Sequence, residues 1–229
     1  MNSKIVWLLA GLAGLAAVLV GAAALLFVAT DSNIGIFGGT QTLDAEEFAK
    51  VQNDYLLRPD DLEVNYFIES GGEKRRGNRL IILEMKEVEG KNYVLDTGRV
   101  DGWYVNLRKS DRTDIAPSTY TNTIDIFEAK AGARLALSPE YFKAYTDDER
   151  EFEFLDENCD YGDECILYTS ERFDAATGLS VIRYDVAFVY GNVLVWISAT
   201  GLDVDISEED IHEAAQIVVD KLEGFESSG

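Results

Sequence analysis

The sequence predicts an α+β domain, an antiparallel sheet with helices packed on one face, that follows an N-terminal transmembrane helix. Three observations predict it: a long uncharged run at the start, a β-hairpin signature followed by an amphipathic helix, and an earlier segment with the same strand–strand–helix order. The chain has 229 residues, of which 47% are hydrophobic, so it has room for one such domain and an appendage.

The composition is strongly acidic. The net charge is −22, from 42 acidic and 20 basic residues. A field of this sign repels phosphate backbones, so we exclude nucleic acid as a partner. It suits solubility, cationic partners or loosely held divalent ions.

The first thirty residues predict a membrane anchor. After Lys4, no residue from Ile5 to Ala29 carries a charge, and the first acid is Asp31. A bilayer core needs about 20 apolar residues in a helix, whereas the core of a signal peptide has only about 7–15. Residues 5–30 are therefore predicted to be an uncleaved single-pass transmembrane anchor, with cleavage after Ala29 as the alternative.

The flanking charges predict the orientation. With Lys4 before the span and only acids close behind it, residues 1–4 are expected in the cytoplasm and the main domain outside the cell membrane. Residues 31–41 are predicted to be a tether, 42–225 the extracytoplasmic α+β domain, and 226–229 a disordered tail.

The first elements of the domain follow local signals. Asp44, three residues before Glu47, predicts the start of a short helix, which "RPDDL" at 58–62 ends. The glycine-punctuated segment 70–78 is predicted to be a loop. It introduces the basic cluster, a hypothetical binding site for an acidic partner, whose members are Lys74, Arg75, Arg76 and Arg79. The alternative is that these cations only balance local charge.

Three strands are expected next, at 79–88, 91–98 and 102–110. The third alternates as a half-buried strand does, with Trp103 and Leu107 on one face.

Two strand–strand–helix units complete the predicted domain. The first covers 102–110, 120–128 and a helix at 129–137, and the second covers 179–191, 192–201 and a helix at 207–225. In the second unit, Gly191–Asn192 is a two-residue hairpin turn. Ser207 is expected to cap the last helix, and Gly224 to end it. Another short helix is predicted from Pro139.

The chain's only cysteines lie in "DENCDYGDEC", the segment 156–165. The spacing between Cys159 and Cys165 is not that of a redox pair, and an even number of cysteines outside the cell favours a disulfide. We predict an acidic surface loop closed by this bond.

The same loop has part of a calcium pattern. Asp156, Asn158 and Asp160 stand at positions one, three and five, but Gly162 comes one place late and Leu167 replaces the final glutamate. A looser calcium site is the alternative to a solvated loop, and its ligands would be Asp156, Asn158, Asp160 and Asp163. No other cofactor is predicted.

No catalytic residue is predicted. The only histidine, His212, lies in the first turn of the last helix, without a recognisable nucleophile motif. No glycine-rich phosphate loop is present, and 42 acids are too many for a carboxylate pair to be selected.

The second unit, "YDVAFVYGNVLVWISATG" with "SEEDIHEAAQIVVDKL", resembles bacterial membrane-anchored or lipoprotein extracytoplasmic domains of PsbP-like type. The earlier "GWYVNLRK" and "NTIDIFEAKAGARLAL" are similar to the first half of such domains. The resemblance implies an α+β sandwich with a binding or accessory role, and it provides no catalytic residues.

Three functions are therefore considered. The first is a membrane-anchored binding or accessory domain that contacts an envelope protein or a small ligand. The alternative is an extracytoplasmic hydrolase that uses carboxylates, with or without calcium, which requires two buried acids facing each other in a cleft. A structural spacer, the third, predicts no concave pocket.

Overall fold

A computed structural model describes residues 40–138, 141, 152–156, 159–175 and 178–226. The chain divides into two units, Met1–Gly38 and Gly39–Gly229. The predicted anchor and residues 227–229 of the predicted tail lie outside the described residues, as does most of the short helix expected from Pro139. Within the described part of the chain, no helix is long and apolar enough to span a membrane.

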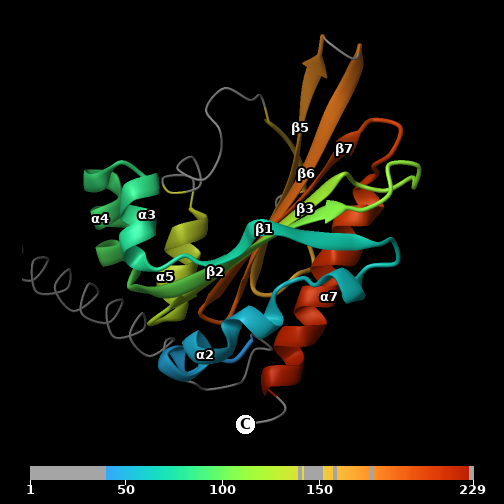
Figure 1. The fold of residues 1–229 in the computed structure, drawn as a ribbon. Coiled ribbons are helices and arrows are strands. Elements are labelled where there is room, and N and C mark those ends of the chain that lie inside the picture. The colour runs from blue at the N-terminus through green and yellow to red at the C-terminus, as the bar shows by residue number, and fades with distance from the viewer. Residues whose placement is uncertain (1–39, 139–140, 142–151, 157–158, 176–177, 227–229) are drawn as a thin grey trace, which may run out of the picture. The chain divides into compact units, whose positions relative to one another are not determined.

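The α+β class is confirmed by one seven-stranded antiparallel sheet with the strand order β1-β2-β3-β7-β6-β5-β4 (Figure 1). Its strands are β1 (Tyr66–Arg75), β2 (Arg99–Lys109), β3 (Thr119–Phe127), β4 (Phe152–Asp156), β5 (Glu164–Asp174), β6 (Leu179–Tyr190) and β7 (Val193–Leu202). The described helices are α2 (Ala45–Val51), α3 (Asn78–Glu84), α4 (Glu87–Thr97), α5 (Lys130–Leu137) and α7 (Glu208–Glu226), with short 3-10 turns at Gln52–Tyr55 and Pro59–Asp61.

Both strand–strand–helix units are present, as β2–β3–α5 and β6–β7–α7. They meet where β3 pairs with β7 at the centre of the sheet. The predicted turn joins β6 to β7, and Gly191 has a φ of 59°, a conformation that glycine adopts without strain. The Asn192 side chain is buried and bonds the Leu43 amide (2.7 Å), the Leu43 carbonyl (3.0 Å) and the Phe127 carbonyl (2.7 Å). It therefore ties the start of the domain to the central hairpin.

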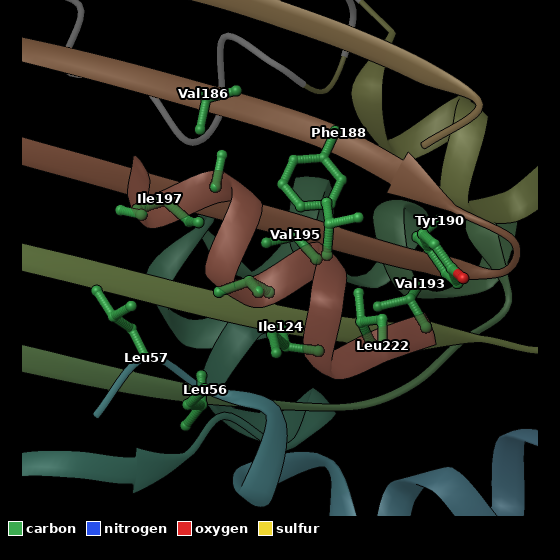
Figure 2. Close-up of a cluster of buried hydrophobic side chains, with 14 of the residues drawn as sticks. Leu56, Leu57, Ile124, Val186, Phe188, Tyr190, Val193, Val195, Ile197 and Leu222 are labelled. Atoms are coloured by element: carbon green, nitrogen blue, oxygen red, sulfur yellow. The ribbon is translucent and has the colours of Figure 1, made fainter. Parts of the chain in front are cut away.

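The expectation that helices cover only one face is wrong. In β7, Val195 belongs to a core that also contains Leu222 of α7 (Figure 2) and Phe48 of α2. The next residue, Trp196, belongs to a second core with residues of α3, α4 and α5. Successive side chains of a strand point to opposite faces, so β7 is buried on both. Its almost unbroken apolar run, "VLVWI", is typical of such a strand.

The strands expected at 79–88 and 91–98 are also wrong, because these segments form α3 and α4. In α4, Gly90, Tyr93 and Thr97 are buried at helical spacing. A side chain at Gly90 would lie 2.5 Å from the Ile82 Cα, so glycine allows the two helices to approach closely. Gly98, in the left-handed region at φ 63°, ends α4.

Local boundaries mostly follow the expected signals. Asp44 caps α2 by accepting a hydrogen bond from the Glu47 amide (2.9 Å). At the start of α7, the Asp210 carboxylate accepts hydrogen bonds from the backbone and hydroxyl of Ser207. Gly224 does not end α7, which runs to Glu226. The loop expected at 70–78 is largely strand, because β1 extends to Arg75 and pairs with β2.

Candidate functional site

A pocket of about 330 Å³ lies beside α3, on the sheet face that carries the α3–α5 core. We call it the β1–α3 pocket. It is lined by Lys74, Arg76, Glu84, Tyr104, Thr121, Thr123, Asp125, Arg183, Leu194, Trp196 and Ser198. These residues come from β1, the β1–α3 connection, α3, β2, β3, β6 and β7, so the site is assembled from distant parts of the sequence.

Neighbouring strands form the floor of the pocket. Tyr104, Thr123 and Trp196 are partners across β2, β3 and β7, and Thr121 and Ser198 are partners in the next row on the same face. Cross-strand partners have their Cβ atoms only about 5 Å apart. The short hydroxyl side chains therefore leave a depression beside the two aromatic rings.

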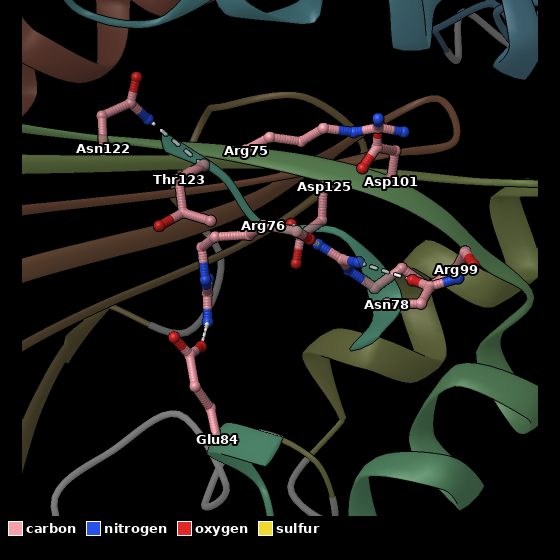
Figure 3. Close-up of polar contacts among 9 residues, drawn as sticks. All are labelled: Arg75, Arg76, Asn78, Glu84, Arg99, Asp101, Asn122, Thr123 and Asp125. Atoms are coloured by element: carbon pink, nitrogen blue, oxygen red, sulfur yellow. Dashed lines mark hydrogen bonds and ion pairs between the residues drawn. The ribbon is translucent and has the colours of Figure 1, made fainter. Parts of the chain in front are cut away.

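Cations form one wall of the pocket. The Glu84 carboxylate lies 2.8 Å from Arg76 Nη2 (Figure 3) and 3.7 Å from Lys74 Nζ. The ammonium of Lys74 also lies 5.6 Å from the centre of the Tyr104 ring, within cation–π range. Two cations therefore share one carboxylate at the edge of the pocket.

A third cation, Arg183, comes from β6. Its Nη2 donates to Asp185 Oδ1 (2.7 Å) and to Ser198 Oγ (2.8 Å). Asp185 is fully buried, and the same oxygen accepts a hydrogen bond from Trp196 Nε1 (3.0 Å). Asp185 therefore holds both the Arg183 guanidinium and the Trp196 indole in place at the pocket.

A buried ion pair lies next to the cationic wall and is hydrogen-bonded to it. Arg99 Nη2 lies 2.7 Å from Asp125 Oδ1, and their side chains are 0% and 2% exposed. Arg99 also donates to Asn78 Oδ1 (2.7 Å) and to the Arg76 carbonyl (2.6 Å), as Figure 3 shows in part. Since Asn78 is the first residue of α3, this network connects the start of the helix that carries Glu84 to β2 and β3.

The ion pair requires a glycine beside it. A Cβ atom at Gly102 would collide with Asp125 Oδ1 and Arg99 Nη2, whose side chains fill that space. Gly102, in "DGWYV", is therefore a glycine because the Arg99–Asp125 contact occupies the space that a Cβ would fill.

Burial changes the chemistry of the phenol in the pocket. It raises the pKa of Tyr104, and nearby Arg76 opposes this shift only in part. The phenol therefore stays neutral at physiological pH and offers a hydroxyl that both donates and accepts hydrogen bonds.

The predicted basic cluster is divided between the two faces of the sheet. Lys74 and Arg76 line the β1–α3 pocket, whereas Arg75 pairs with Asp101 (Nε–Oδ2 2.7 Å) beside Trp103, the partner of Arg75 on β2. Arg79 is exposed on α3. Strand alternation separates residues that are adjacent in sequence. Whether the cluster binds an acidic partner stays a prediction.

Sequence reasoning missed most of the pocket. Tyr104, Glu84, Asp125, Arg183 and Trp196 each looked like an ordinary residue of a strand or helix. The available signal was polar residues inside the central strands, such as the aspartates in "TIDIF" and "RYDVAF", because a charged residue there needs a buried partner.

The predicted disulfide between Cys159 and Cys165 is confirmed, with the two Cα atoms 5.2 Å apart. Inside the loop that it closes, the Tyr161 hydroxyl lies 2.7 Å from His212 Nδ1. His212 therefore joins the loop to the first turn of α7.

Asp163, in the same loop, anchors three parts of the chain. Its carboxylate accepts hydrogen bonds from the Thr40 amide (3.1 Å), the Thr40 hydroxyl and the Gly191 amide (3.0 Å), and it lies 2.8 Å from Lys130 Nζ. We call this arrangement the Asp163 clasp. It joins the start of the domain to the β6–β7 turn and to α5.

The predicted calcium site remains a prediction. Asn158 and the Asp156 side chain lie outside what the structure describes, Asp160 is exposed, and Asp163 already serves the clasp. Among the described residues, no group of three His, Cys, Asp or Glu side chains could hold a metal ion. Gly162, which stands one place later than the calcium pattern requires, is a glycine for another reason. Its φ is 62°, and a Cβ there would collide with the Val189 carbonyl.

Among the described residues, the buried acids Asp125, which lines the pocket, and Asp185, next to it, do not form the facing pair that a carboxylate hydrolase needs. Asp125 is paired with Arg99 and Asp185 with Arg183. Each carboxylate therefore has an arginine as its immediate neighbour, and neither faces the other as an acid–base pair.

Comparisons with known proteins leave the family open. No protein-family model matches the chain, and no curated protein matches it. Among solved structures, the chain is similar to the extracellular domain of PknH from Mycobacterium tuberculosis, with a TM-score of 0.47 and 13% sequence identity over 81% of this chain and 100% of that one. The resemblance to PsbP-like domains stays a prediction.

Gly102→Ala is expected to destabilise the fold by about 1–3 kcal/mol, because the new methyl group must displace the buried Arg99–Asp125 pair. Urea unfolding followed by circular dichroism measures this loss. The matched control is Gly224→Ala, where a Cβ has open space and which should leave stability unchanged or slightly raised. Equal stability of wild type and Gly102→Ala would show that the ion pair does not need this space.

The Asp163 clasp predicts an acid-dependent stability. Burial alone raises the pKa of Asp163, but hydrogen bonds from Lys130, Thr40 and the Gly191 amide outweigh it, so the pKa lies below its ordinary value of 3.8. The carboxylate thus contributes fully at a pH well above 3.8, and this contribution is lost as the pH falls through the folded-state pKa.

Asp163→Asn is therefore expected to lower the free energy of unfolding by about 1–3 kcal/mol at neutral pH. Because it lacks the titrating carboxylate, the variant should lose less stability than wild type on acidification below pH 3.8. Thermal unfolding across a pH series measures both effects. Asp160→Asn, which changes an exposed acid of the same loop, is the control. Parallel pH profiles for wild type and Asp163→Asn would contradict the assignment.

Proposed function

We propose that the chain is a binding domain that takes a small organic anion in the β1–α3 pocket. The observation that carries the proposal is the convergence of Lys74, Arg76 and Arg183 on one pocket of a chain whose net charge is −22. Cations gathered at one pocket of an acidic protein favour an anion at that place, while the remaining surface repels polyanions.

The lining supports a particular ligand chemistry. Guanidinium and ammonium groups bind carboxylates and phosphates through charge-assisted hydrogen bonds. Hydroxyls of Thr121, Thr123 and Ser198 add neutral hydrogen bonds, and Leu194 and Trp196 add apolar surface. A volume of about 330 Å³ is at the lower end for small-molecule sites. The proposed ligand therefore has one anionic group and a small apolar body, and the presence of the pocket argues against a spacer.

We further propose that the domain works outside the cell on a single membrane anchor, as a binding or accessory module of the envelope. The uncharged run from Ile5 to Ala29 and the bond between Cys159 and Cys165 support this. Disulfides persist in oxidising compartments, and a run of this length suits a membrane span.

Binding is tested by calorimetric titration of the full chain with two probes, benzoate and inorganic phosphate, at constant ionic strength. We expect binding of at least one probe, and about a three- to tenfold loss of affinity in Lys74→Gln, which removes one cation from the wall. Lys91→Gln, on the exposed face of α4, is the matched control and should bind as wild type does. The absence of binding, or equal affinity in wild type and Lys74→Gln, would refute the anion site.

The location is tested on protein purified from its native envelope. Mass spectrometry after alkylation is expected to show modification of Cys159 and Cys165 only when a reductant precedes the alkylating agent. A Cys165→Ser variant should expose one alkylatable thiol without reductant, which controls for accessibility. Two free thiols in the native protein would count against the extracytoplasmic location.

A further inference from the structure

We propose that Glu84 is a built-in competitor for the anionic ligand of the β1–α3 pocket. Its carboxylate occupies the position between Lys74 and Arg76 that a carboxylate of the ligand takes, so binding is an exchange of one carboxylate for another. This inference rests on the proposed function and adds the residue that regulates affinity at that site.

The geometry of Glu84 is that of a bound carboxylate. One oxygen, Oε2, lies 2.8 Å from Arg76 Nη2, and the other, Oε1, lies 3.7 Å from Lys74 Nζ. Each oxygen faces a different cation, which is how a two-cation site receives a carboxylate from a ligand. The protein itself therefore shows which chemical group the wall accepts.

Glu84 is also placed so that it can leave. It is the last residue of α3, and its side chain is 36% exposed. The Lys74 side chain is 47% exposed. Exposed ion pairs of flexible side chains contribute little to stability, so a ligand displaces the contact with Lys74 at low cost. The Arg76 side chain is less exposed, at 13%, and stays in place to receive the carboxylate of the ligand. The 3.7 Å separation from Lys74 is long for a charge-assisted hydrogen bond.

The other acids of the site cannot exchange in this way. The carboxylates of Asp125 and Asp185 are 2% and 0% exposed, and each has a buried or half-buried arginine as its partner. Removing one member of such a pair leaves an uncompensated charge out of water. Among the carboxylates described at the pocket or next to it, Glu84 is therefore the one that a ligand replaces.

The charges of the pocket lining are compatible with this exchange. Among the lining residues that the structure describes, the cations are Lys74, Arg76 and Arg183, and the carboxylates are those of Glu84 and Asp125. Glu84 lowers the affinity for the ligand because only molecules in which its carboxylate has left the wall bind the ligand there.

The decisive variant is Glu84→Gln in the full chain, titrated with benzoate and with inorganic phosphate by calorimetry at constant ionic strength. The amide keeps the shape of the side chain but removes its charge, so we expect about tenfold tighter binding of the probe that wild type binds. Glu87→Gln, an exposed glutamate of α4 that pairs with Lys91, is the matched control and should bind as wild type does. Thermal unfolding of each variant verifies that the fold is intact.

The outcomes separate the two proposals. If neither wild type nor Glu84→Gln binds either probe, the proposed function fails and this inference fails with it. If wild type binds and Lys74→Gln weakens binding, but Glu84→Gln binds equally or more weakly, the anion site stands and the competitor is refuted. Tighter binding in Glu84→Gln together with unchanged binding in Glu87→Gln supports the inference.

Discussion

The buried ion pair between Arg99 and Asp125 is the interaction on which the candidate site depends. It connects β2 to β3, and through hydrogen bonds to Asn78 and the Arg76 carbonyl it also connects these strands to the start of α3. A charge taken out of water is costly unless its partner is held in place, so the pair imposes one arrangement on the elements around it. Gly102 supplies the space that this arrangement needs.

The two faces of the sheet have different roles. One face carries the larger core, in which α7 and α2 cover strands such as β3, β6 and β7. The other face is divided between a smaller core under α3, α4 and α5 and the polar β1–α3 pocket. Most of the apolar burial lies in the larger core on the first face, so the second face can hold charged groups. The larger core is therefore separate from the pocket, whereas Leu194 and Trp196 belong both to the smaller core and to the pocket lining.

Features with local signals could be predicted from the sequence, and features created by long-range pairing could not. The Gly191–Asn192 turn, the stripe of α7 and the cysteine pair are each encoded within a few residues. In contrast, the short apolar run "RLIILEM" is compatible with a strand or a helix, and in the structure it forms α3, which packs against α4. The pocket could not be predicted because Arg76 and Arg183 line it together only after β7 pairs with β3, a pairing between segments about 70 residues apart.

The Asp163 clasp has a mechanical consequence. Tension that enters the domain through Thr40 first meets hydrogen bonds to the Asp163 carboxylate, in a loop that Cys159–Cys165 closes covalently. The load then passes through Gly191 to the β6–β7 turn and through Lys130 to α5, instead of peeling one edge strand from the sheet. A pull on the N-terminal side is thus spread over the middle of the fold, away from the wall that holds Glu84 and Lys74.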